Sequence, residues 1–282
     1  VRKVGLGDIY VGTPAWGNYI PIVKEGGNNV QIYSYYDEEK KDINFSAIIE
    51  SLKSAPAKSA FILQACCHNP TGADLSEDQW KEIAVIMKER NLFPIFDIAY
   101  LGLGSGSIDD DAWSVRYFYD QGFEMMVCQS YSKNMGLYSE RVGCLHVVSE
   151  LESIAAVQSL LVSIFRSECS FAPAFGARIA IETMNNLETE WKKDVSEAAE
   201  RLKKLRASIL EKFVELKTPG KWDHVTKQSG LFWFTGLNVD QINRLREDEH
   251  VYMTLDGRAN VAGLSFKDVD SFCESVDRVV RN

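Results

Sequence analysis

Short apolar runs follow one another along the first half of the chain and predict buried β-strands. Four of these runs lie at residues 61–67, 92–96, 124–129 and 142–148. Each has about the length of a strand and is bounded by turn residues or by an amphipathic segment. Pro94 argues mildly against a central position for the second strand, because proline cannot donate a hydrogen bond to a neighbouring strand.

Helical periodicity separates these strands. Apolar side chains recur over residues 80–87 with the i, i+3, i+4, i+7 spacing of an amphipathic helix. Ser76 and Gln79 precede that pattern and predict a capping box at its start. A second helix is expected over residues 112–121, with Gly122 at its end. Strands that alternate with helices predict an α/β fold, in which helices sandwich a mostly parallel sheet on both faces.

The pattern changes after Ser149. This serine and Glu152 predict the start of a helix that reaches about Arg166. A longer helical pattern covers residues 187–216 and ends before Pro219. A helix of roughly thirty residues is about 45 Å long, at 1.5 Å per residue. That length is unusual within one compact domain, so we expect this helix to connect two domains.

The remaining residues predict a small α+β domain. We expect strands at residues 231–235 and 251–254, with a helix between them, and a last helix capped at Ser265. The domain organisation that follows is a large domain over residues 1–200 and a small C-terminal domain over residues 201–282.

Composition and charge exclude several classes of protein. Of 282 residues, 45% are hydrophobic and 25% are charged, which is ordinary for a globular protein. The net charge of −9 argues against a surface that binds nucleic acid or an anionic membrane. No apolar run approaches the ~20 residues of a membrane span. Six cysteines without a C-x-x-C pair and four scattered histidines indicate reduced cysteines and no metal site.

The polar loop after the third strand carries candidate chemistry. It places Lys133 among small hydroxyl residues, with Arg141 eight positions later. A lysine that attacks a carbonyl must be partly neutral, and desolvation or a neighbouring cation lowers its pKa enough. Serine hydroxyls and an arginine suit a phosphate dianion. The loop could therefore hold pyridoxal phosphate by its aldehyde, on Lys133, and by its phosphate, on Ser130 and Arg141. The alternative is a polar loop with a solvated lysine.

Polar residues also follow the other strands. Three predicted strand ends carry polar residues: Asn69, Asp97 with Tyr100, and residues 130–133. The carboxyl ends of parallel strands share one edge of a sheet, so these residues are expected to lie together. A buried Asp97 could keep the cofactor's ring nitrogen protonated, while Tyr100 and Asn69 could face the ring hydroxyl. Turn formation and ordinary packing are the alternatives for these three. Arg258 could bind a carboxylate or could be a surface charge.

Several motifs together resemble a known family. They occur in its order and at its spacing, from end to end of the chain, at residues 68–72, 97–100, 130–138, 140–143 and 257–258. In these residues the chain resembles the class I pyridoxal-phosphate-dependent aminotransferases, most closely the aspartate aminotransferases of animals. The resemblance implies the fold of the type I pyridoxal-phosphate-dependent transferases.

The resemblance also implies roles for individual residues. Lys133 would form the aldimine with the cofactor and then move the substrate's proton, and Asp97 would pair with the ring nitrogen. The catalytic residues would be Lys133, Asp97 and Tyr100. The cofactor-binding residues would be Trp16, Asn69, Asp97, Tyr100, Ser130, Ser132, Lys133 and Arg141. The substrate-binding residues would be Trp16, Asn69, Arg258 and, reaching in from a second subunit, Arg166.

The activity that the resemblance implies is transfer of an amino group between aspartate or glutamate and 2-oxoglutarate or oxaloacetate. It also implies a homodimer with shared active sites. The acidic sequence pI of about 5.1 and the absence of a presequence favour the cytoplasm, although a mitochondrial address before Val1 stays open. Two alternatives remain. One is an aminotransferase with aromatic or kynurenine specificity, or a β-lyase. The other is a catalytically weak paralogue or fragment that acts as a dimerisation partner.

The chain departs from the family pattern in two respects. Members of the family have a further segment before the position of Val1, with a glycine-rich phosphate loop, so we expect this chain to be part of a longer subunit. Tyr19 and Gln64 stand where close relatives have histidines. Both side chains could hydrogen-bond Asp97, but neither carries the charge of a histidine, so turnover or substrate range could differ.

Overall fold

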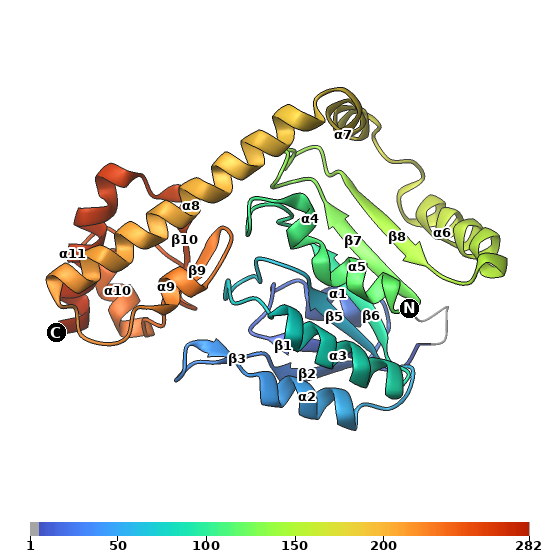
Figure 1. Ribbon diagram of the computed structural model, residues 1–282, viewed down its shortest axis with the longest axis horizontal. Helices are drawn as coiled ribbons and strands as arrows, with labels where there is room; N and C mark the ends of the chain where they lie inside the picture. Colours follow the sequence, from blue (N-terminus) through green and yellow to red (C-terminus); the bar gives the residue numbers. More distant parts are fainter. Residues whose placement is uncertain (1–5, 282) are drawn as a thin grey trace.

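A six-stranded sheet forms the centre of the computed structural model, which describes residues 6–281 (Figure 1). Residues 1–5 and residue 282 lie outside the described part. The strand order is β2-β1-β5-β6-β7-β8. The strands are β1 (Ile9–Thr13), β2 (Val30–Ser34), β5 (Ala60–Gln64), β6 (Phe93–Ile98), β7 (Met125–Ser130) and β8 (Gly143–Val148). All neighbouring pairs are parallel except β7 and β8, which are antiparallel.

Strand β6 occupies a central position although it contains Pro94. Its ladder with β5 includes Pro94, opposite Phe61, but its ladder with β7 starts only at Ile95. The proline therefore has a strand neighbour on one side alone. This arrangement explains why a residue without an N–H group is compatible with the middle of the sheet.

Helices α2 (Phe45–Ser54), α3 (Glu77–Glu89) and α5 (Trp113–Asp120) cover one face of the sheet (Figure 1). Their apolar side chains and those of β6 share one core, which includes Ile48, Leu52, Ile83, Met87, Phe96 and Phe118. The predicted capping box is confirmed: the hydroxyl of Ser76 accepts from the N–H of Gln79, and the side chain of Gln79 accepts from the N–H of Ser76.

The opposite face of the sheet is covered less evenly. Helix α1 (Tyr19–Glu25) packs Val23 against Ile9 and Ala60. Farther along this face, the register partners Cys128 and Leu145 are exposed. Helix α6 (Ile154–Cys169) follows β8 and buries none of its side chains fully. The prediction of helices on both faces therefore holds over β1 and β5 but not over β7 and β8.

The long helix α8 (Glu188–Leu216) follows α7 (Phe175–Asn186) and extends to the far end of the C-terminal part (Figure 1). Its 29 residues match the helix predicted from the sequence. Charged side chains occupy its outer face. Within residues 6–281, no helix combines the length and the apolar character that crossing a bilayer requires.

Residues 202–281 surround a second core, and we call them the C-terminal unit. Its core includes Leu205, Ile209, Phe213, Trp233 and Val276. The elements after α8 are α9 (His224–Lys227), β9 (Phe232–Phe234), α10 (Val239–Glu247), β10 (Arg258–Asn260) and α11 (Val269–Arg281). The boundary at residue 200 stays a prediction.

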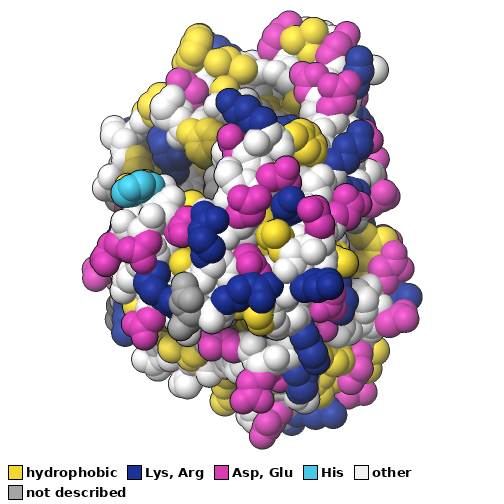
Figure 2. All heavy atoms as spheres, turned by 90° about the vertical axis from the view of Figure 1, so that its left-hand side faces the viewer, with side chains coloured by type: hydrophobic (Ala, Val, Ile, Leu, Met, Phe, Trp, Pro, Cys, Tyr) yellow, Lys and Arg dark blue, Asp and Glu magenta, His cyan; other side chains and the backbone are white. Residues whose placement is uncertain are grey.

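The second strand of the C-terminal unit differs from its prediction. Residues 251–254 form no strand, and β10 pairs antiparallel with β9 instead. The smaller elements are β3 (Tyr36–Asp37), β4 (Asp42–Ile43), α4 (Ile108–Asp111) and the short 3-10 helices η2 (Leu151–Ser153), η3 (Val261–Gly263) and η4 (Phe266–Asp268). Figure 2 looks onto the C-terminal unit and shows acidic and basic side chains interspersed over that face. Exposed ion pairs of this kind contribute little to stability, so the apolar core must hold the unit together.

Arg206 joins α8 to the segment that leads into β9. Its side chain is 2% exposed and donates to four backbone oxygens, those of Val225, Ser229, Gly230 and Phe232. We expect Arg206→Met to lower the free energy of unfolding by about 3 kcal/mol, because it leaves buried carbonyl groups without donors. Urea unfolding measures this change.

The matched control is Arg201→Met. Arg201 also lies on α8 and donates to two backbone oxygens, but it is exposed. Water replaces its hydrogen bonds, so we expect a loss below about 1 kcal/mol. Equal effects of the two substitutions would contradict the role given to Arg206.

Candidate active site

Polar side chains from three strand ends meet at one edge of the sheet. Asn69 follows β5, Asp97 and Tyr100 lie at the end of β6, and Lys133 follows β7. The amide nitrogen of Asn69 lies 3.4 Å from the hydroxyl of Tyr100. The amine of Lys133 lies 5.0 Å from the centre of the Tyr100 ring. The convergence expected from the sequence is therefore present.

The C-terminal unit contributes an arginine to the same place. Arg258 begins β10, and its guanidinium donates to the side-chain oxygen of Asn69 at 2.9 Å. The guanidinium also lies over the ring of Phe232, 4.6 Å from its centre. Arg258 is half-buried, so it is a component of this cluster rather than a free surface charge.

The surroundings of Asp97 disfavour the charged form of its carboxyl group. Burial raises the pKa of its carboxyl group. A hydrogen bond from Tyr19 and the charge of Lys133 act in the opposite direction, but burial has the larger effect. The carboxylate therefore favours a cationic partner placed next to it.

The surroundings of Lys133 likewise disfavour the charged form of its amine. Burial lowers the pKa of its amine, and the charge of Arg141 lowers it further, while Asp97 raises it. More of the amine is neutral near pH 7 than for an exposed lysine. A neutral amine is what attack on a carbonyl group requires. Asp97 and Lys133 thus lie close enough to influence each other's charge.

The hydroxyl and guanidinium groups predicted to hold a phosphate flank Lys133. The hydroxyl of Ser130 accepts from the backbone N–H of Ser132 at 3.2 Å. Arg141 is exposed and donates to the backbone oxygen of Tyr138 at 2.9 Å. Donors from both ends of the loop are therefore available to an anion beside Lys133.

Two predicted site residues lie farther out. Trp16 is 40% exposed and meets the ring of Tyr19 edge to face, with 5.4 Å between ring centres. Arg166 is exposed on α6. That helix follows β8, which is antiparallel to β7, so it starts at the opposite edge of the sheet. In the described chain, no hydrogen bond or ion pair links Arg166 to the rest of the cluster.

Gln64 does not have the partner that the sequence suggested. Its amide nitrogen donates to the backbone oxygen of Asn69 at 3.1 Å, and its oxygen accepts from the N–H of Asn69 at 2.9 Å. The expected hydrogen bond to Asp97 is therefore wrong for Gln64. The turn after β5 brings the backbone of Asn69 within reach, and two local bonds use both ends of the amide. Gln64 thus fixes the position of Asn69.

One contact of the lysine loop is not visible in the sequence pattern. The indole N–H of Trp191, on α8, donates to the backbone oxygen of Asn134 at 2.8 Å. The side chain of Asn134 donates in turn to the backbone oxygen of Leu101 at 3.2 Å. The residue next to Lys133 is therefore tied to the long helix. Trp191 had been visible only as one apolar position of a helical pattern.

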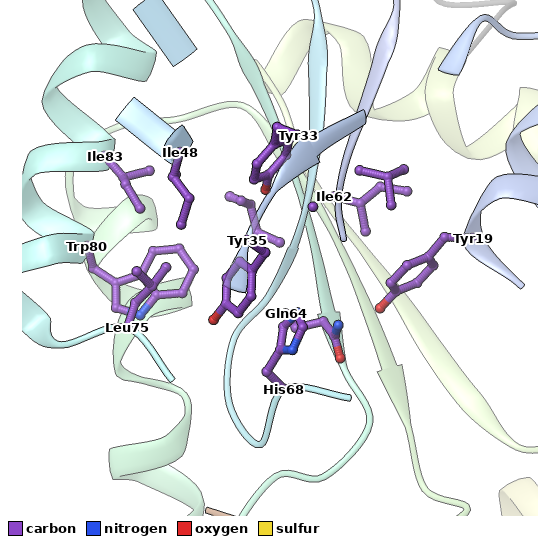
Figure 3. Close-up of a pocket in the computed structure, with 13 residues that line it drawn as sticks. Tyr19, Tyr33, Tyr35, Ile48, Ile62, Gln64, His68, Leu75, Trp80 and Ile83 are labelled. Carbon is purple, nitrogen blue, oxygen red and sulfur yellow. The ribbon is translucent and has the colours of Figure 1, made fainter. Parts of the chain in front are cut away.

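A small cavity lies beside this cluster (Figure 3). Its volume is about 20 Å³, and Tyr19, Gln64 and His68 are among its lining residues. That space suits about one water molecule and cannot hold a cofactor. His68 stacks on Tyr35 with 3.9 Å between ring centres, and burial lowers the pKa of its imidazole to about 3. We regard His68 as a neutral packing residue.

Comparison with known proteins identifies the family. The profile of the family "Aminotransferase class I and II" matches residues 7–276. The chain belongs to this aminotransferase family. The cytoplasmic aspartate aminotransferase of Gallus gallus is 42% identical over 276 residues, which cover 96% of this aminotransferase and 67% of the relative. The chain thus spans about two thirds of that relative's length.

Solved structures of aminotransferases agree. The broad specificity aminotransferase from Leishmania mexicana superposes with a TM-score of 0.95 at 39% identity, covering 98% of this chain and 69% of that one. An aromatic-amino-acid aminotransferase from Burkholderia pseudomallei, covalently bound to pyridoxal phosphate, gives a TM-score of 0.96 at 31% identity, covering 99% and 71%. The predicted fold class is confirmed.

Enzymes of this family are pyridoxal-phosphate-dependent transaminases, and this aminotransferase has side chains that fit the cofactor. Lys133 offers an amine whose pKa is lowered by burial. Asp97 offers a half-buried carboxylate with one hydrogen bond from the protein. Donors for a phosphate lie in the same loop as the lysine. An amine, an accepting carboxylate and hydrogen-bond donors together match an aldehyde, a protonated ring nitrogen and a phosphate.

Proposed function

We propose that this protein is an aspartate aminotransferase that moves an amino group between a dicarboxylic amino acid and a 2-oxo acid. The observation that carries the proposal is the convergence of Lys133 and Tyr100, from two strand ends, with the Arg258–Asn69 pair beside them. The name of the 42% identical relative supports the choice of substrate.

In this proposal Lys133 moves the proton. As a neutral amine it would remove the proton from the substrate's α carbon. As an ammonium it would then deliver that proton to the carbon of the cofactor that carried the aldehyde. Bound pyridoxal phosphate supplies an electron sink that makes the proton removal feasible. Burial lowers the pKa of the Lys133 amine, which favours its neutral form.

Asp97 holds the proton of the ring nitrogen in this scheme, because a buried carboxylate stabilises an adjacent cation. Tyr100 and Asn69 donate to the ring oxygen, and their mutual contact at 3.4 Å orients them toward one point. Trp16 covers the ring. Burial raises the pKa of the Tyr100 hydroxyl, so the phenol remains a donor.

The remaining predicted residues bind the ends of cofactor and substrate. Ser130, Ser132 and Arg141 hold the phosphate. Arg258 and Asn69 bind the α-carboxylate of the amino acid, and Arg258 exchanges its bond to Asn69 for the incoming anion. A planar guanidinium recognises a carboxylate through two parallel hydrogen bonds.

Arg166 binds the second carboxylate from a neighbouring subunit in a homodimer. Support comes from the apolar side chains exposed on its side of the molecule, because large exposed apolar surfaces mark interfaces. These side chains include Leu151 (85% exposed), Val162, Phe165, Phe171 (82%), Phe175 and Ile181. A second copy of the chain would cover them and bring Arg166 to the site.

We expect Arg166→Ala to lower kcat/KM for aspartate and glutamate about 100-fold, through loss of a charge-assisted hydrogen-bonded pair. Steady-state kinetics measure this change, and an aromatic amino acid should keep its rate. Arg178→Ala is the matched control, since Arg178 is an exposed arginine on the next helix. Unchanged aspartate kinetics would instead favour an aromatic or broad specificity, as in the relatives from Burkholderia pseudomallei and Leishmania mexicana.

A subunit-mixing experiment tests the shared site. Inactive Arg166→Ala and Lys133→Ala subunits are mixed, dissociated and reassociated. If Arg166 acts across the interface, each hybrid dimer has one intact site, and activity recovers to about a quarter of the wild-type value. If Arg166 acts within its own subunit, no recovery occurs.

Two further assignments belong to this proposal. One is a division into a cofactor-binding domain over residues 1–200 and a small domain over residues 201–282, supported by the two separate cores. The other is a cytoplasmic location, which the name of the Gallus gallus relative supports.

A further inference from the structure

We propose that Tyr19 is a positioning residue for the cofactor: its neutral hydroxyl holds Asp97 in place and leaves one carboxylate oxygen free for the ring nitrogen. This inference rests on the proposed function, because it assigns Asp97 to the ring nitrogen. It concerns a residue outside the predicted set of catalytic and cofactor-binding residues.

The geometry of Tyr19 is that of a dedicated donor. The residue begins α1 and is 7% exposed. Its hydroxyl donates to one carboxylate oxygen, Oδ2, of Asp97, which lies 78 positions later in the sequence. Helix α1 packs on the face of the sheet toward which Asp97 points, so a side chain from its first turn reaches the acid directly.

The other side chains around Asp97 do not donate a hydrogen bond to its carboxylate in the described chain. Gln64, the neighbour on β5, uses its amide on the backbone of Asn69. Cys128, the neighbour on β7, forms no hydrogen bond with Asp97 in the part of the chain that the structure describes. Tyr100 is a neutral phenol, and Lys133 acts on Asp97 through its charge. Within residues 6–281, the hydrogen bond to the Asp97 carboxylate comes from Tyr19.

A tyrosine in this position gives the pair a constant charge. Burial, followed by the charge of Asp97, raises the pKa of the Tyr19 hydroxyl well above its usual value. The phenol therefore stays protonated through neutral pH and never adds a positive charge beside the ring nitrogen. A histidine here would change its charge between about pH 5 and pH 8. Tyr19 thus holds the acid without competing with the cationic ring for it.

The test measures binding of pyridoxamine 5′-phosphate, which carries the ring and the phosphate but has no aldehyde to react with Lys133. We expect Tyr19→Phe to raise its dissociation constant about tenfold at pH 7.5, since a hydrogen bond to a charged group is lost. Tyr33→Phe is the matched control. Tyr33 is also 7% exposed and lines the cavity shared with Tyr19 (Figure 3), and within residues 6–281 no hydrogen bond joins it to Asp97.

A double-mutant cycle separates positioning from packing. In an Asp97→Asn background, Tyr19→Phe should change the dissociation constant less than threefold, because the charged partner is gone. An equal loss in both backgrounds means that Tyr19 acts through packing, and it overturns the inference. So does a Tyr19→Phe variant that binds like the wild type.

Tyr19→His provides a second variant should Tyr19→Phe fold poorly. At pH 8 its neutral imidazole still donates a hydrogen bond, so affinity should return toward the wild-type value. Relative to the wild type, affinity should fall toward pH 6 as the imidazole gains charge. A flat ratio between pH 6 and pH 8 overturns the inference. Failure of the wild-type protein to bind the probe would instead contradict the proposed function.

Discussion

Replacement of Lys133 by alanine is expected to lower the rate of transamination by at least about 10⁴-fold. The substitution removes both the amine that attaches the cofactor and the group that moves the proton, and each alone contributes orders of magnitude. The fold should persist, because Lys133 is half-buried and no hydrogen bond of its side chain holds the loop within the described chain. Asn134, tied to α8 by Trp191, keeps the loop in place.

Borohydride treatment with pyridoxal phosphate, followed by peptide mass analysis, measures covalent attachment at Lys133. The matched control is Lys41→Ala. Burial also lowers the pKa of Lys41, but its amine contacts the ring of Trp222 and the backbone oxygen of Lys221, away from the sheet edge. Attachment should survive in this control. Cofactor fixed to a different lysine in the wild type would refute the assignment.

Asp97→Asn is expected to lower kcat by about 10³-fold while leaving the protein folded. Asparagine has nearly the same shape and still accepts from Tyr19, but it cannot carry the negative charge that keeps the ring nitrogen protonated. A loss of 10³-fold corresponds to about 4 kcal/mol, the scale of a buried charge deprived of its partner. Steady-state kinetics measure the rate, and Asp97→Glu, which keeps the charge, should lose less.

Although Asp97→Asn should lower kcat, we expect it to keep or raise the free energy of unfolding. Burial raises the pKa of Asp97 in the folded state above its unfolded value. An acid of this kind destabilises the fold once pH exceeds the unfolded pKa of about 3.9, and the cost is complete above the folded pKa. The cofactor-free variant should therefore be at least as stable as the wild type at pH 7. Below about pH 3.5 the advantage should disappear. A variant less stable at pH 7 would indicate that Asp97 is mainly structural.

Both results together distinguish a functional acid from a structural one. Asp111, which is buried, shows the contrast. Its carboxylate accepts from the backbone N–H groups of Gly102, Gly104 and Ser105, and so closes a loop. Asp97 is half-buried, accepts from a single side chain and lies within reach of the charge of Lys133. A half-buried carboxylate with so few partners is more readily explained by a ligand than by the fold.

Much of the local structure was determined by the sequence. The capping box at Ser76 and the long helix α8 were both predicted from spacing and composition. The prediction also placed Asn69, Asp97 and Lys133 at strand ends, because the carboxyl ends of parallel strands meet at one edge. These features depend on neighbouring residues and on repeating geometry, which a sequence states directly.

The pairings between distant elements were decided only by the tertiary structure. Arg258 reaches Asn69 across 189 positions, and Tyr19 rather than Gln64 donates to Asp97. Pro94 fits a central strand because the ladder with β7 begins one residue later. These pairings depend on the register of the strands and on the packing of the helices. A shift by a fraction of a side chain's length would change which groups are within hydrogen-bonding distance. A linear pattern shows which groups are available, but only packing selects which of them meet.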